Sequence, residues 1–363
     1  MIVIGTDTHK KSHTCAAVFA GTGQLASGLT ASARKAGFAE LLDWGRELDP
    51  ERIWAIEDCR HVSRAFERFL LASGESVVRV APKLMGQSRR GERTRGKSDP
   101  IDALAVARAA LREGPETLPA AHLDEAVLEL KLLLDHREDL VKARSEDQQR
   151  LRWHLHDLWP EFELPAGCLD RTVWLDRLAR RLARAEQGAR VRVSRELVRA
   201  IRERTKRASG LEREIGAMVR AQAPQLLELP GCGALTAAKL IAETAGAARF
   251  ASDAKLARLA GIAPIPASSG NRTRLRLDRG GNRQLNCAVH RIAVTQSRVH
   301  PPAKDYLARK RAEGKSTREA LRCLKRHLIR RVWRLLNESE IDRSMTTVDS
   351  QRGTLAPQFA AVA

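Results

Sequence analysis

The 363-residue chain lacks long apolar runs, clustered cysteines and a leader pattern. No run approaches the roughly 20 apolar residues that a membrane-spanning helix needs, and the N-terminus opens directly on a strand pattern instead of a signal peptide. The six cysteines are far apart and form no CxxC pair, which argues against a zinc site and against a disulfide framework. With 43% hydrophobic and 30% charged residues, the composition predicts a soluble globular protein of a reducing cytosol, with two or three domains and no membrane partner.

Positive charge, in contrast, is abundant and uneven. The formal net charge is +20, and 19 lysines and arginines stand against 4 acids between Arg272 and Arg334. Such an imbalance is the electrostatic footprint of a polyphosphate partner, so this segment predicts nucleic-acid binding. A membrane-surface role is disfavoured because no strongly apolar helical face accompanies the charges. The predicted contacts in this segment are Arg272, Arg274, Arg276, Arg279 and Arg283.

Residues 1–113 alternate short apolar runs with helical spacing. This order predicts a mixed sheet with helices packed on it. Strands are predicted over Ile2–Asp7, Thr14–Phe19, Arg52–Asp58 and Ser76–Ala81. Helices are predicted over Ala36–Glu47, Val62–Ala72 and Asp99–Arg112, the last capped by Ser98. Gly86–Lys97 has no periodicity and several arginines, which predicts a mobile loop.

Acidic residues stand at the ends of these predicted elements. Asp7 ends the first strand, and Glu57 or Asp58 ends a later one, because strand alternation leaves that choice open. Asp99 and Asp102 are three residues apart and share a helix face. Four carboxylates can hold two Mg²⁺ ions about 3.5–4 Å apart, the geometry for in-line attack on phosphodiesters. The alternative is that the two helical acids only cap the helix and favour its dipole.

From about Leu118 to Ala223 the pattern changes to long helices. Charges of both signs alternate and apolar residues recur three and four positions apart, with a break from Trp159 to Gly167. The pattern predicts a helical hairpin or a coiled-coil arm. A coiled coil usually means oligomerisation, and an intramolecular helical pair is the alternative.

Two glycine-rich motifs follow the helical segment. In LPGCGALTAAKLIA, Gly231 and Gly233 form a tight turn before a helix, a pattern that aims backbone N–H groups at a phosphate; an ordinary helix turn is the alternative. In GIAPIPASSGNRTRLR, Ser268 or Ser269 stands on a Pro/Gly turn ahead of alternating arginines. A hydroxyl there can attack a phosphate that the cations hold, although SSG is also common loop composition.

Six motifs occur in a specific order: IGTDTHK, AIEDC, KSDPIDA, LPGCGALTA, GIAPIPASSG and RGGNRQL. As a set they cover roughly residues 1–340, and the chain resembles the DEDD-type insertion-sequence transposases of the IS110 family. The resemblance implies an α/β RNase H-like (RuvC-like) catalytic domain at 1–115 and an α-helical coiled-coil arm at 118–223. It also implies a mostly α-helical, serine-bearing transposase domain with a helix-hairpin-helix element at 224–340, which leaves 341–363 as a disordered tail.

The resemblance also implies a site and a mechanism. It places Ser269 as the nucleophile, with Ser268 as second choice, and selects Glu57 over Asp58. The Ser269 hydroxyl would attack a DNA phosphodiester and form a covalent phosphoserine link, with Mg²⁺ on the acids activating the hydroxyl. Pro100 departs from many relatives but is compatible with a first helical turn. The implied metal ligands are Asp7, Glu57, Asp99 and Asp102.

The implied partners are double-stranded donor and target DNA and a noncoding guide (bridge) RNA that supplies sequence specificity. The family resemblance further implies homodimers or homotetramers, in which the serine of one protomer completes the acid site of another. The expected location is the bacterial cytoplasm, at the nucleoid.

Two other functions compete with this interpretation. A hydrolytic RNase H-like nuclease or Holliday-junction resolvase would need only the acids, and a non-enzymatic DNA-binding protein would need only the basic helices and the glycine turn. A tyrosine recombinase is disfavoured because the only tyrosine, Tyr306, precedes the HLIR sequence, whereas that class places the tyrosine last. A DEDD exonuclease is disfavoured because Asp7 has no partner acid two residues on.

Overall fold

The computed structural model describes residues 1–57, 60–81, 84–85, 98–118, 120–121, 124–266, 275–276, 278 and 281–353, without the side chains of 60–61 and 340–353. The chain divides into two compact units. The first comprises Met1–Asp124 and Ala248–Ala251, and the second comprises Glu125–Ala247 and Ser252–Ala363. The predicted loop Gly86–Lys97 lies outside the described residues.

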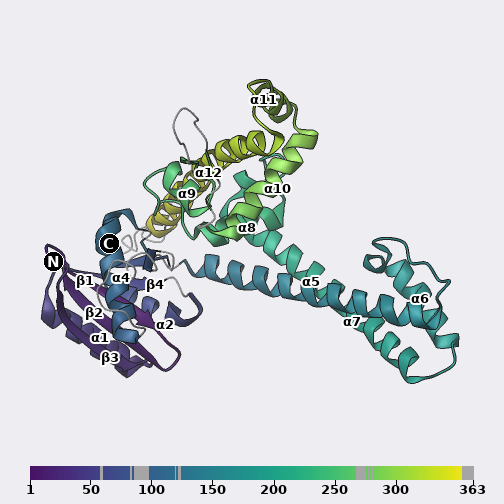
Figure 1. Cartoon of the computed structure of the whole chain (residues 1–363), viewed down its shortest axis with the longest axis horizontal. Helices are drawn as coiled ribbons and strands as arrows, with labels where there is room; N and C mark the ends of the chain where they lie inside the picture. Colours follow the sequence, from purple (N-terminus) through teal and green to yellow (C-terminus); the bar gives the residue numbers. More distant parts are fainter. Residues whose placement is uncertain are drawn as a thin grey trace, which may run out of the picture. The chain divides into compact units, whose positions relative to one another are not determined.

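The first unit is built on one five-stranded sheet in the order β3-β2-β1-β4-β5 (Figure 1). The first three strands are antiparallel neighbours, whereas β4 and β5 run parallel to β1. This is the arrangement expected of an RNase H-like fold, and the predicted mixed sheet is confirmed. The strands are β1 (Ile2–Thr8), β2 (Ser12–Phe19), β3 (Leu25–Ser32), β4 (Arg52–Glu57) and β5 (Val77–Val80).

Helices cover both faces of this sheet because the side chains of its central strands are buried on both sides. Ile2 and Ile4 of β1 pack under α1 (Lys35–Leu48) and α2 (Arg60–Ala72). Val3, which points the other way, packs with residues of α4 (Asp99–Glu113). The predicted helices are thus confirmed, with one correction at a cap. Ser98 is the N-cap residue of α4, yet within the described part of the chain its side chain makes no capping hydrogen bond.

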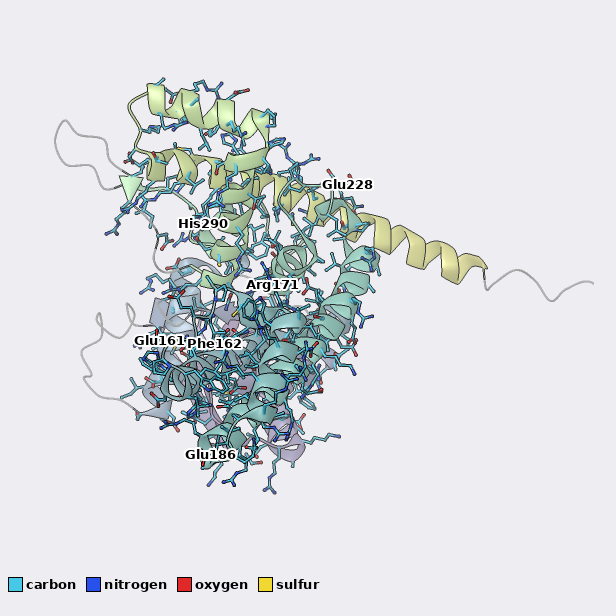
Figure 2. The ribbon with its side chains drawn as sticks, turned by 90° about the vertical axis from the view of Figure 1, so that its right-hand side faces the viewer. Glu161, Phe162, Arg171, Glu186, Glu228 and His290 are labelled. Carbon is cyan, nitrogen blue, oxygen red and sulfur yellow. The ribbon has the colours of Figure 1, made fainter. Side chains whose placement is uncertain are left out.

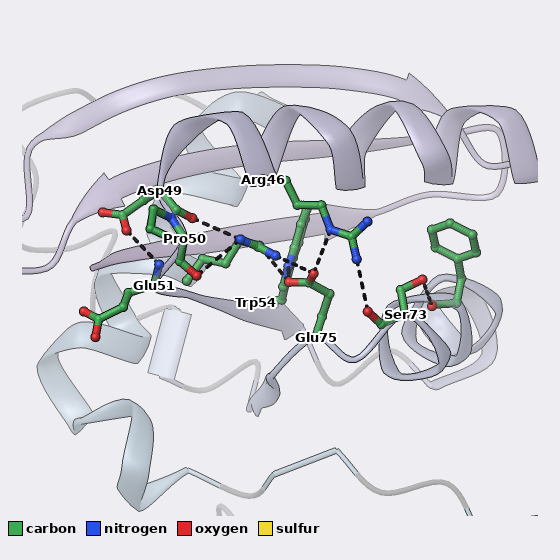
Figure 3. A network of polar contacts seen from close by, with 9 residues as sticks. Arg46, Asp49, Pro50, Glu51, Trp54, Ser73 and Glu75 are labelled. Carbon is green, nitrogen blue, oxygen red and sulfur yellow. Dashed lines mark hydrogen bonds and ion pairs between the residues drawn. The ribbon is translucent and has the colours of Figure 1, made fainter.

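A buried carboxylate fixes the start of β4 to the turn before β5 (Figure 3). Glu75 accepts hydrogen bonds from Arg52 Nη2 at 2.6 Å, from Trp54 Nε1 at 3.0 Å and from Arg46 Nε at 3.3 Å. Burial opposes the negative charge, but the hydrogen bonds from Arg52 and Trp54 outweigh it and hold the pKa of Glu75 below its usual value. The network fixes the N-terminal end of β4, and Glu57 lies at the opposite end of that strand, where it pairs with Val80 of β5.

The second unit contains two long helices that lie side by side, α5 (Glu125–Leu158) and α7 (Ala189–Gln222) (Figure 1). Cross-helix ion pairs such as Arg137–Glu212, at 2.7 Å, accompany the apolar contacts. Between them in sequence come η2 (Cys168–Asp170) and α6 (Thr172–Arg184), which pack on one end of the pair. The predicted long helices are confirmed as an intramolecular pair; a supercoiled coiled coil stays a prediction.

The described residues in the remainder of the second unit form helices and one short hairpin. Its elements are η3 (Pro224–Leu226), α8 (Ala234–Thr244), α9 (Asp253–Leu259), β6 (Ile265–Pro266), β7 (Leu275–Arg276), α10 (Arg283–Val299), α11 (Pro301–Ala312) and α12 (Thr317–Gly353). The last helix corrects the predicted tail at 341–363, because it continues to Gly353. The sequence before Gly353 contains no proline or glycine that would end it. Across the described residues, no helix combines the length and apolarity required to cross a membrane.

Candidate active site

The two central strands bring Asp7 and Glu57 to one edge and one face of the sheet. β1 pairs with β4 in parallel from Ile2↔Arg52 to Thr6↔Ile56, so the next step places Asp7 beside Glu57. Residues in register on parallel neighbours point to the same face, and alternate residues share a face. Val3 and Ala55 pack on the α4 side, which puts Asp7 and Glu57 on that side as well. Asp58 lies outside the described residues.

A glycine lets α4 approach this face closely. A Cβ on Gly5 would lie 2.2 Å from the Ala103 carbonyl oxygen and 2.3 Å from the Ala107 nitrogen, so the helix backbone rests on the strand at this point. Only glycine permits such an approach. Gly5 lies two residues before Asp7 in β1, and Ala103 lies one residue after Asp102, at the end of the first turn of α4. The contact therefore sets the helix acids Asp99 and Asp102 against the end of β1.

A histidine lies between two of these acids. His9 Nε2 is 3.2 Å from Asp7 Oδ2 and 3.4 Å from Asp99 Oδ1. One ligand atom from each of the three residues lies within 4.8 Å of the others. His9 is absent from the sequence-based prediction, although it stands two residues after Asp7 in IGTDTHK. That spacing on a strand end is the signal that could have found it, because alternate strand residues share a face.

The electrostatics of the cluster favour a cation. Burial raises the pKa of the Asp7 carboxyl above its ordinary value; His9 partly offsets this, and the nearby Asp102 and Asp99 carboxylates raise it further. A divalent ion would relieve this repulsion, and carboxylate oxygens are the donors that Mg²⁺ prefers. The donor set present therefore fits a hard divalent metal, with Asp7 as its most rigid member.

The segment that contains the predicted nucleophile is closed at its base by two glycines of the second unit. Gly261 has a φ of +63°, and a Cβ on Gly281 would lie 2.1 Å from the Gly261 nitrogen, so the two backbones touch. Between them, Ile265 pairs with Arg276 and Pro266 with Leu275 as an antiparallel stem. Arg276 and Arg283 are exposed. The predicted residues Ser268, Ser269, Arg272, Arg274 and Arg279 lie outside the described residues.

Two asparagines of RGGNRQLN anchor the base of this stem. Asn282 caps α10, because its Oδ1 accepts hydrogen bonds from the backbone nitrogens of Gln284 and Leu285. Its Nδ2 donates to Glu243 Oε2 at 2.6 Å. Asn286 Nδ2 donates to the carbonyls of Ala260, at 2.8 Å, and Gly261, at 3.2 Å.

The other end of the Asn286 amide accepts a hydrogen bond from Lys325 Nζ, which comes from α12. Lys325 is buried, and burial lowers its pKa to about 8. A buried ammonium is costly unless it is hydrogen-bonded, so the hydrogen bond to Asn286 stabilises the charge of Lys325 and at the same time fixes the Asn286 amide. These residues are absent from the sequence-based prediction because their significance lies in contacts across 25 residues or more of chain.

The tight turn predicted at Gly231 and Gly233 is present, and close packing against α10 is one reason for the glycine at position 231. Gly231 has a φ of +84°, and a Cβ there would lie 2.9 Å from Thr295 Cβ of α10. Gly233 is the N-cap residue of α8, and a Cβ there would meet open space. The position of Gly233 is compatible with a phosphate contact, which stays a prediction.

The first unit is thus an α/β domain with a carboxylate centre at the end of its central strand, suited to divalent metal ions and phosphodiester chemistry. Known sequence families match segments of both units. A sequence family described as "Transposase" matches residues 4–160, and one described as "Transposase IS116/IS110/IS902 family" matches residues 223–308.

Three relatives are proteins of insertion elements. The chain is 26% identical to an uncharacterized 44.8 kDa protein of IS116 from Streptomyces clavuligerus (94% of this chain, 96% of the relative). It is 27% identical to an uncharacterized 42 kDa protein of IS900 from Mycobacterium paratuberculosis (94% and 97%). It is 30% identical to an uncharacterized 43.6 kDa protein of IS110 from Streptomyces coelicolor (67% and 71%). Among solved structures, T. thermophilus RuvC in complex with a Holliday junction substrate aligns with 33% of this chain and 99% of its own, at 15% identity and a TM-score of 0.27.

The chain belongs to the IS110 family of insertion-element transposases. The family membership predicted from the ordered motifs is confirmed, and a transposase cuts and rejoins DNA.

Proposed function

We propose that this transposase cuts and rejoins DNA with Ser269 as nucleophile, assisted by Mg²⁺ on a tetrad formed by Asp7, Glu57, Asp99 and Asp102. The observation that supports the proposal most directly is the proximity of Asp7 of β1 and Asp99 of α4, which lie in one cluster with His9. Glu57, on the strand paired with β1, and Asp102, on the first turn of α4, would complete the proposed tetrad.

Each acid has a distinct part in holding the metal. Asp7 is buried on the central strand and provides a fixed ligand, and Glu57 would contribute from the neighbouring strand. Asp99 and Asp102 come from the first helical turn, where the helix N-terminus also stabilises their negative charge. When bound, the divalent metal would lower the pKa of the attacking hydroxyl and neutralise charge on the phosphate.

The covalent step exchanges one phosphate ester for another. The Ser269 oxygen forms a bond to phosphorus while a phosphodiester P–O bond breaks, and the DNA oxygen that leaves takes up a proton. Attack by a hydroxyl of a second DNA strand then releases the serine and rejoins the DNA, so no oxidant or nucleotide is consumed. The glycine contact and the Asn282 and Asn286 anchors support this role, because they fix both ends of the segment that holds Ser269.

Recognition follows from the charge distribution. The basic segment from Arg272 to Arg334 and the turn at Gly231 and Gly233 would contact nucleic-acid backbones, while a bridge RNA would supply sequence specificity by base pairing. The contacting side chains of the basic segment would be Arg272, Arg274, Arg276, Arg279 and Arg283. Assembly as a homodimer or homotetramer would let a serine from one protomer meet the acids of another. The protein would act at the nucleoid in the bacterial cytoplasm.

The test compares Ser269→Ala with Ser268→Ala on a DNA substrate that carries a nick near the cleavage site, so that a covalent intermediate accumulates. Ser269→Ala is expected to abolish the protein–DNA adduct and strand exchange while DNA binding is retained; Ser268→Ala is expected to keep all three. Full recombination by Ser269→Ala would refute the serine mechanism. Metal-dependent cleavage without any adduct in the wild type would favour the hydrolytic resolvase instead.

A further inference from the structure

The outer face of α6 has a line of arginines. Leu175, Leu178 and Leu182 of this helix are buried against the long helix pair. The opposite side presents Arg177, Arg180 and Arg184, all exposed and spaced three and four residues apart. Residues at that spacing lie one above the other on a helix, so the three guanidinium groups form one stripe.

Positive charge is concentrated at this end of the helix pair. From Arg171 to Arg199 the sequence has nine arginines and three acids, whereas α5 has six basic residues and eight acids. Figure 2 looks onto this end of the helix pair, where Arg171 is labelled. The excess is therefore a local property of α6 and the start of α7, and it is distinct from the basic C-terminal segment.

Several arginines of the arm are held by ion pairs, whereas, among the described residues, the stripe arginines are not. Arg137, Arg202 and Arg204 each form an ion pair with a carboxylate. In the part of the chain that the structure describes, the three stripe arginines have no carboxylate partner; Arg180 only donates to a backbone oxygen of its own helix. Their guanidinium groups are therefore available to an anionic ligand.

Aromatic residues hold the surroundings of the stripe in place. Arg181 lies over the rings of both Trp159 and Phe162, at 4.3 and 4.2 Å from their centroids, and Arg177 lies 5.2 Å from the Trp174 centroid. These cation–π contacts reduce side-chain freedom before any ligand binds. A preorganised cationic surface loses less entropy on binding than a mobile one.

The spacing suits a nucleic-acid backbone. The seven helical steps from Arg177 to Arg184 span about 10 Å, and one strand of a duplex presents a phosphate about every 3.4 Å along its axis. Three guanidinium groups a helical turn apart can therefore contact phosphates along one strand, and guanidinium binds phosphate in a bidentate manner. Two such stripes would repel each other, which disfavours a second copy of the chain as the occupant.

We propose that Arg177, Arg180 and Arg184 form a second nucleic-acid surface that binds the phosphate backbone of a duplex. The ligand chemistry is a run of phosphates, which either flanking DNA or a helical stem of RNA can supply. This proposal does not depend on the serine chemistry or on the metal site, because it concerns binding alone.

The experiment measures binding of full-length protein by fluorescence anisotropy, with a DNA duplex and an RNA hairpin stem of equal length, across a series of salt concentrations. The test variant is R177Q/R180Q/R184Q. The control is R207Q/R213Q/R220Q, which removes the same charge from exposed positions of α7. Both variants keep the buried contacts, and their melting curves should match that of the wild type.

The test variant is expected to bind at least tenfold more weakly at about 0.1 M salt, and its salt slope should be smaller by about 2–3 because each lost phosphate contact removes about 0.9. A loss confined to DNA or to RNA supports the surface and identifies the source of the phosphates; a loss for both supports a general backbone site. Affinities and slopes equal to those of the control would overturn the proposal. So would a changed oligomeric state in sedimentation with unchanged nucleic-acid binding, because the stripe would then be a protein contact.

Discussion

Substitution of Gly5 by alanine tests how closely the acid cluster depends on one contact. The new methyl group would start 2.2 Å from a helix carbonyl oxygen and 2.3 Å from a helix nitrogen, so α4 must move away by about 1 Å or more. Overpacking of this kind costs about 1–3 kcal/mol of stability. The first turn of α4 would move with the helix, and a 1 Å misplacement of catalytic groups lowers rates by about 100-fold.

The matched controls are Gly28→Ala, where the new methyl group meets an ordinary 3.4 Å contact in β3, and Gly21→Ala, where it meets open space. Stability is measured by denaturant unfolding, and DNA cleavage is measured well below the melting temperature so that all variants are folded. Gly5→Ala is expected to lose stability and about 100-fold in cleavage, while both controls stay near the wild type. Normal cleavage by Gly5→Ala would refute the idea that the α4–β1 contact positions the acids.

Three further predictions concern single polar residues. Asp7→Asn should abolish metal-dependent cleavage. In metal-free protein at neutral pH it should also raise the melting temperature, because the pKa of Asp7 is raised in the folded protein and its ionised form therefore costs stability at pH values above the ordinary carboxyl pKa. A lower melting temperature would contradict this. Asn286→Ala should cost about 1–3 kcal/mol in denaturant unfolding and reduce the covalent adduct, because it removes two hydrogen bonds to the stem base and leaves Lys325 without its amide partner; Asn337→Ala, whose amide only donates within its own helix, is the control. Burial lowers the pKa of Lys325 to about 8 in the folded protein, against an ordinary value of 10.5, so the unfolded chain binds more protons between these two values. The free energy of unfolding should therefore rise with pH across that window, and Lys325→Met should lose this rise. A pH profile of Lys325→Met identical to that of the wild type would show that the lysine is not buried as described.

The sequence predicts the first unit well because its main elements have strong periodic signals. β1, β4 and α4 are evident from apolar runs and helical spacing, and the acids at their ends follow. β3 is absent from the prediction because it is an edge strand with half-exposed residues and little alternation. Likewise the choice between Glu57 and Asp58 needs the strand register, which local pattern does not contain.

The polar anchors are harder to predict for a different reason. His9, Asn282 and Asn286 acquire their roles from partners that are distant in sequence or on another element. A single polar residue in a loop or at a helix start has many ordinary explanations, so composition alone does not identify it. The arginine stripe of α6 is visible as spacing in the sequence, yet its significance depends on which face the leucines bury.

The central claim is that a serine in the basic half of the chain attacks DNA with help from acids in the first unit. Peptide mapping by mass spectrometry of the adduct trapped on nicked DNA in Mg²⁺ tests it most directly. The account predicts a nucleotide on Ser269 in the wild type and no adduct in Asp7→Asn. An adduct on any other residue, or an undiminished adduct in Asp7→Asn, would contradict it.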